Sequence, residues 1–76
     1  MNTNEIETKI ELLEKQIEKY DIMAIVTGDQ YEHERRISTL GRAIETKKFI
    51  KIFLSQGRQI KNGMIRDLET SLEATK

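Results

Sequence analysis

Apolar residues recur at alternating spacings of four and three residues in the first third of this chain. The positions are Ile6, Ile10, Leu13, Ile17, Tyr20 and Ala24. This is the heptad spacing of a coiled-coil seam, and it is narrower than the apolar stripe of an ordinary core helix. Asn4 and Glu7 have the spacing of a capping box, so the pattern predicts a helix over residues 4–26.

One turn signal follows this helix, in residues 27–30. Gly28 tolerates a positive φ at a helix C-terminus, and Asp29 is a good N-cap for a second helix. That second helix is predicted over residues 30–56, antiparallel to the first. The chain has no proline, and most of its charged residues are good helix formers, which favours helices throughout.

The last segment predicts a shorter helix over residues 59–74. Its apolar stripe consists of Ile60, Met64, Ile65, Leu68 and Leu72. Gly57 marks the break before this helix, and Gly63 weakens it internally. The predicted fold is therefore a single all-α domain, residues 1–76, consisting of an antiparallel helical hairpin with coiled-coil character and a C-terminal helix.

The dense apolar run near the end of the second helix predicts self-association. Its members, Phe49, Ile50, Ile52, Phe53 and Leu54, spread over more than half of a helix circumference. One antiparallel neighbour cannot cover them, so we expect the third helix and a second copy to do so. The predicted oligomer or partner interface comprises this run and Ile6, Ile10, Leu13, Ile17 and Tyr20. Because the run is rich in β-branched and aromatic residues, a short strand over 49–54 stays open as an alternative.

Charge is divided by position along the chain. Residues 1–34 carry nine acids and three bases, whereas residues 35–66 carry nine bases and one acid, Glu45. The first helix has acids at three e positions of its heptads, Glu7, Glu14 and Asp21, which a basic neighbouring helix would pair with. Three acids cannot neutralise nine bases, so we expect some basic surface to stay open to a partner.

Several of these bases are candidate contacts for a small anionic ligand. The candidates are Tyr31, Arg35, Arg36, Arg42, Lys47 and Lys48. Guanidinium and ammonium groups bind phosphates, and an aromatic ring stacks on a base. The simpler alternative is a solvated face whose bases pair with the first helix.

No motif with a catalytic mechanism occurs in the sequence, so we expect no enzyme, no metal site and no cofactor. His33 is the single histidine and there is no cysteine, which leaves too few ligands for a zinc site. The longest apolar run, residues 22–26, is far too short to span a membrane. We therefore expect a cytoplasmic protein that does not enter the membrane.

One segment carries a family resemblance. Gly28-Asp29, Glu32 and residues 37–44 (Ile-Ser-Thr-Leu-Gly-Arg-Ala-Ile) resemble the second helix of small phage proteins of the anti-CBASS sponge type. The resemblance covers residues 28–44. It implies a phage protein that acts in the host cytoplasm, forms oligomers and sequesters cyclic nucleotide immune signals between its subunits.

Three hypotheses for function follow. In the first, a non-enzymatic oligomer docks on a host protein and inhibits or bridges it, as a phage counter-defence or accessory protein would. In the second, which the resemblance implies, the basic helix holds a small anionic ligand such as a cyclic nucleotide. In the third and least favoured, the chain is a nucleic-acid-binding regulator with a steep salt dependence.

Overall fold

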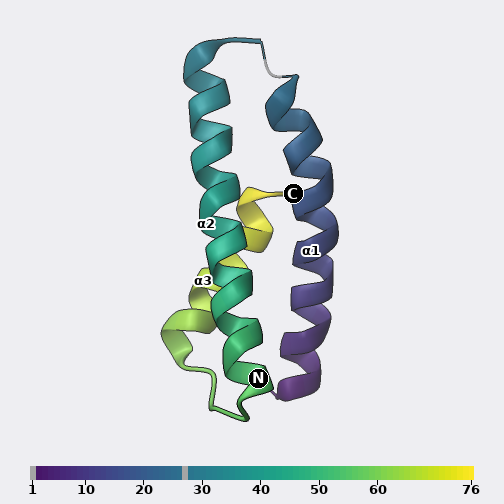
Figure 1. Ribbon diagram of the computed structural model, residues 1–76, viewed down its shortest axis with the longest axis vertical. Helices are drawn as coiled ribbons and strands as arrows, with labels where there is room; N and C mark the ends of the chain where they lie inside the picture. Colours follow the sequence, from purple (N-terminus) through teal and green to yellow (C-terminus); the bar gives the residue numbers. More distant parts are fainter. Residues whose placement is uncertain (1, 27) are drawn as a thin grey trace.

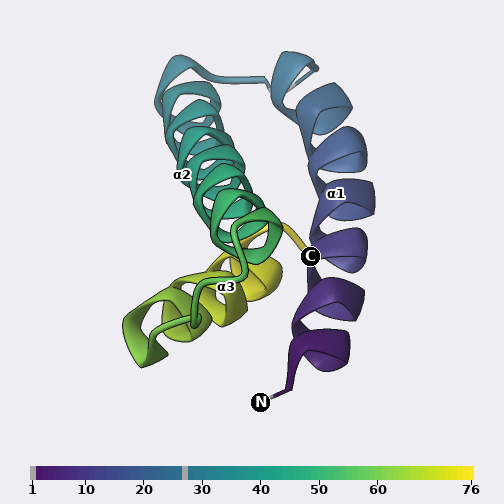
Figure 2. The same cartoon turned by 60° about the horizontal axis from the view of Figure 1, so that its bottom comes forward.

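Three helices pack into one bundle in the computed structural model, which describes residues 2–26 and 28–76 and, for Ala24 and Ile25, the backbone alone. Helices α1 (Thr3–Ile25) and α2 (Gln30–Ser55) form an antiparallel hairpin, and α3 (Asn62–Ala74) packs against both. Figures 1 and 2 show α3 on one side of the hairpin, beside its lower half. The described residues contain no strand, which confirms the predicted all-α class.

The heptad seam of α1 is buried inside the single chain. Ile6, Ile10 and Leu13 lie in a cluster with Ile50 of α2 and Leu68 of α3. Partly buried side chains surround this core: Ile17, Leu54, Ile60, Met64 and Leu72. The side chain of Ala24, the last seam position, lies outside the described residues.

The first helix begins earlier than predicted. Its N-cap is Asn2, whose Oδ1 accepts the backbone N–H of Glu5 at 2.9 Å, and not Asn4. Both asparagines have a glutamate three residues later, so the sequence offers two equivalent capping boxes. Capping at Asn2 adds residues to α1 and lets the Ile6 N–H bond to the Asn2 carbonyl.

The turn between α1 and α2 differs in part from the prediction. Asp29 is the N-cap of α2, as expected, and its carboxylate accepts the backbone N–H of Glu32 at 2.7 Å. The C-cap of α1 is Val26 and not Gly28. Thr27 lies outside the described residues.

Gly57 ends α2, as predicted. Its φ is +67°, and its N–H bonds to the Leu54 carbonyl while the Arg58 N–H bonds to the Phe53 carbonyl. This pair of bonds is the Schellman motif, which satisfies carbonyls at the helix end. The Arg58 guanidinium stacks 3.8 Å from the centre of the Phe53 ring and so covers one face of it. Residues 49–54 are therefore helical, and the strand alternative is wrong.

α3 begins at Asn62, three residues later than predicted. The residues from Arg58 to Lys61 form an irregular link, in which Ile60 packs against the core. Because Ile60 reaches the core from this link, the helical stripe of α3 starts at Met64. Leu68 is fully buried in the core cluster with residues of α1 and α2, and Met64 and Leu72 of α3 pack against that cluster.

Candidate functional site

The six residues predicted to bind an anion do not converge. Tyr31 is 79% exposed and lies in the first turn of α2. Arg35, Arg42 and Lys48 are also exposed, whereas Arg36 and Lys47 are half-buried. At 100° per residue Tyr31, Arg35 and Arg42 share one flank of α2, whereas Arg36, Lys47 and Lys48 point in other directions. The structure therefore does not bring all six together in one site, and Arg42 is the member of the shared flank that lines a groove.

The side chain of Arg36 makes its contacts within the chain. Its guanidinium donates to Glu32 Oε1 from Nη2 at 2.8 Å and from Nε at 3.3 Å. It also lies 5.8 Å from the centre of the Tyr20 ring of α1. The hydrogen bond to Glu32 raises the pKa of Arg36 above its ordinary value. These contacts join α1 to the first turns of α2, so we assign Arg36 a structural role.

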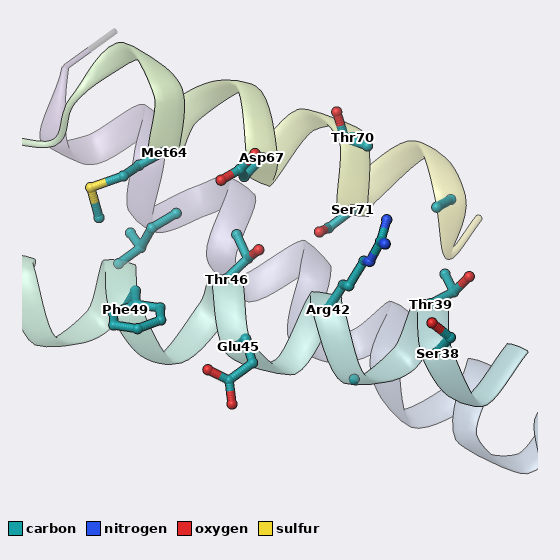
Figure 3. A pocket seen from close by; sticks show the side chains of 13 residues that line it. Ser38, Thr39, Arg42, Glu45, Thr46, Phe49, Met64, Asp67, Thr70 and Ser71 are labelled. Carbon is teal, nitrogen blue, oxygen red and sulfur yellow. The ribbon is translucent and has the colours of Figure 1, made fainter. Parts of the chain in front are cut away.

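An open groove of about 850 Å³ lies between α2 and α3 (Figure 3). From α2 it is lined by Ser38, Thr39, Gly41, Arg42, Glu45, Thr46, Phe49 and Ile50, and from α3 by Met64, Asp67, Thr70, Ser71 and Ala74. One end is apolar, since Phe49 and Met64 lie there, and the other end carries hydroxyl groups. Among the six predicted ligand contacts, Arg42 alone lines this groove.

Arg42 is the cation of the groove. Figure 3 shows it extending from α2 towards α3, while Glu45 points away from α3. Within the described residues no carboxylate forms an ion pair with Arg42. Asp67 on the opposite wall supplies a negative charge. The groove therefore presents a cation, a carboxylate and an aromatic ring to whatever enters it.

The predicted interface residues divide into three groups by exposure. Ile6, Ile10, Leu13 and Ile50 are buried in the core of the chain itself, and Ile17, Tyr20, Phe53 and Leu54 are half-buried. The exposed members are Phe49 at 56% and Ile52 at 49%. Phe49 lines the groove, so it is the member of this set best placed to contact a partner.

Only one wall of the groove could be predicted from the sequence. Thr39, Arg42, Thr46 and Phe49 are spaced by three, four and three residues, which places them on one flank of α2. That spacing was available in the sequence. The wall formed by α3 was not, because periodicity within a helix does not show which flank a third helix will cross.

Neither a metal site nor a membrane span is found in the described part of the chain. No group of three or more His, Asp or Glu residues there could hold a metal ion. No helix there combines the length and the apolar character needed to cross a bilayer.

The fold and the groove define the chain as a three-helix bundle with an open interhelical groove. No protein-family model, curated protein or solved structure matches this chain.

Proposed function

We propose that this bundle is a non-enzymatic binding protein that docks on a protein partner through the groove between α2 and α3, as an inhibitor or an adaptor. The observation that carries the proposal is Phe49, a large aromatic side chain that stays 56% exposed in a groove open to solvent. Exposed aromatic anchors with a polar rim are typical of protein interfaces.

The shape of the groove supports a peptide segment or helix as the bound element. Two helices form its walls, and an amphipathic helix that enters such a groove places its apolar side chains against the floor. Phe49 and Met64 offer the apolar contact, and Arg42 and Asp67 offer charges of both signs at the rim. We expect the partner segment to combine apolar residues with at least one acidic residue that reaches Arg42.

Replacing Phe49 by aspartate tests this proposal. We expect the variant to fold normally, because Phe49 is more than half exposed, and to lose at least about 2 kcal/mol of binding, or about thirty-fold in affinity. The measurement is the amount of partner retained by the immobilised protein from an extract of its own cells, followed by titration once the partner is purified.

The matched control is Leu12→Asp, since Leu12 is 49% exposed and belongs to α1, outside the groove. We expect it to retain the partner as the wild type does. If Phe49→Asp retained as much partner as the wild type, the proposal would be wrong.

Arg42 favours a second candidate, a sponge for a small anionic ligand such as a cyclic nucleotide immune signal. A guanidinium without an ion pair, beside hydroxyl groups and an aromatic ring, suits a phosphate attached to a base. The resemblance of residues 28–44 to phage sponges supports the same candidate. Asp67 on the opposite wall opposes it, and we therefore rank it second.

Calorimetric titration with cyclic di- and trinucleotides at low salt tests this second candidate. If the sponge hypothesis holds, Arg42→Ala should weaken binding at least tenfold, because hydrogen bonds to a charged group contribute about 1.5–3 kcal/mol. Arg35→Ala is the control, since Arg35 is an exposed base of α2 that does not line the groove. If none of these nucleotides gave a heat of binding, the sponge hypothesis would be excluded.

A further inference from the structure

The hairpin has one face that α3 leaves open, and we call it the back face. On α1, Lys9 pairs with Glu69 of α3 at 3.6 Å, and Gln16 accepts a hydrogen bond from Thr75 beyond its end at 2.9 Å. These contacts fix the flank of α1 that faces α3. Residues about 180° around the helix from Lys9 and Gln16 therefore belong to the back face.

Five acids form a continuous stripe on that back face. They are Glu7, Glu11, Glu14, Glu18 and Asp21, spaced by four, three, four and three residues. No base of α1 interrupts the stripe. Glu14 pairs with Lys51 of α2 at 3.4 Å, which shows that the stripe borders α2. Within the described residues the other four acids of the stripe have no ion-pair partner.

The neighbouring flank of α2 is apolar and basic. Ile37, Ile44, Lys48 and Lys51 share it, at spacings of seven, four and three residues. Ile37 is 45% exposed, Ile44 is half-buried and Lys48 is exposed. Lys48 has no ion-pair partner among the described residues. The back face therefore consists of an acidic stripe from α1 beside an apolar and basic stripe from α2.

We propose that a second copy of this chain packs on the back face, related by a two-fold axis that runs parallel to the hairpin helices. Such an axis places α1 of each copy along α2 of the other. Because α1 and α2 are antiparallel within the chain, each intermolecular pair is also antiparallel, and the two hairpins form a four-helix arrangement. The same residues then make the same contacts twice.

The charges select this axis over the other face-to-face arrangement. A two-fold axis perpendicular to the helices would place α1 against α1, so that two acidic stripes would repel each other. A two-fold axis parallel to the helices leaves the position of each residue along the bundle unchanged. Residues of the two copies therefore meet at equal heights. The ion pair between Lys51 and Glu14 shows which residues of α2 and α1 lie at the same height. Lys48 lies one turn nearer the hairpin turn than Lys51, so it faces Glu14 and Glu18 of the second copy.

Apolar contact and charge have separate roles in this interface. Ile37 and Ile44 of both copies bury their exposed surface, which supplies affinity. The ion pairs at its edges are partly solvated, so they set orientation more than affinity, and salt weakens them. This interface is on the opposite face from the groove of the proposed function, and it does not depend on that function.

Charge reversal at Glu18 and Lys48 tests the proposal. The wild type is expected to sediment as a dimer at low salt, and Glu18→Lys and Lys48→Glu are each expected to weaken the dimer at least tenfold. An equimolar mixture of the two variants should regain the dimer, because each contact then joins a lysine to a glutamate. Both residues are exposed, so circular dichroism should show unchanged folding.

Arg35→Glu is the control, since Arg35 is an exposed base of α2 outside the back face. It should leave the dimer intact. Phe49→Asp should also leave it intact, so a failure of the groove proposal would not be mistaken for a failure of this one. A monomeric wild type at all concentrations, or a dimer that neither charge reversal affects, would overturn the inference.

Discussion

Replacing Leu68 by alanine is expected to lower the free energy of unfolding by about 2–5 kcal/mol. Leu68 is fully buried where α3 meets α1 and α2, so its removal leaves a cavity in the core as well as losing the burial. A domain of this length has a total stability of about 4–11 kcal/mol, so the loss is a large fraction of it. Urea unfolding followed by circular dichroism measures the change.

Leu12→Ala is the matched control, because it removes the same atoms from a leucine that is half exposed on α1. We expect it to cost less than about 1 kcal/mol. If both variants lost the same stability, Leu68 would not hold the central position in the core that the structure gives it.

Removing α3 altogether should abolish cooperative folding. A chain of residues 1–57 keeps the hairpin but loses Leu68, Leu72 and Met64, which cover the lower half of it. Leu13 and Ile50 would then be exposed, and so short a chain buries too little apolar surface to offset its conformational entropy. We expect a broad, non-cooperative thermal transition in place of a sharp one.

A peptide of residues 58–76 provides the complementary test. Added in excess to the shortened chain, it should restore a cooperative transition, because it supplies the missing wall of the core. A shortened chain that unfolds cooperatively at the midpoint of the full chain would contradict the role assigned to α3.

The sequence predicted the three helices because their signals are local. The heptad spacing, the cap at Asp29 and the break at Gly57 each act within a few residues, and the structure has all three. The misplaced cap shows the limit of such signals, since Asn2 and Asn4 carry the same motif and only the surrounding structure distinguishes them.

The site could be predicted only in part because it depends on how the helices cross. The heptad seam suggested an interface between copies, yet Ile6, Ile10 and Leu13 are buried by α2 and α3 of their own chain. A periodic apolar stripe shows that a residue needs a neighbour and does not show whether that neighbour belongs to the same chain. For the same reason the bases of α2 looked like one site, although Arg42 alone lines the groove.

Site-specific photo-crosslinking tests whether the chain binds a partner through the groove between α2 and α3. A photoreactive residue is placed at position 49 in one variant and at position 12 in another, and both are irradiated in the producing cells. We expect a specific adduct from position 49, at a mass above that of the chain, and no adduct of comparable yield from position 12. Equal adducts from both positions, or none from position 49, would contradict binding through the groove.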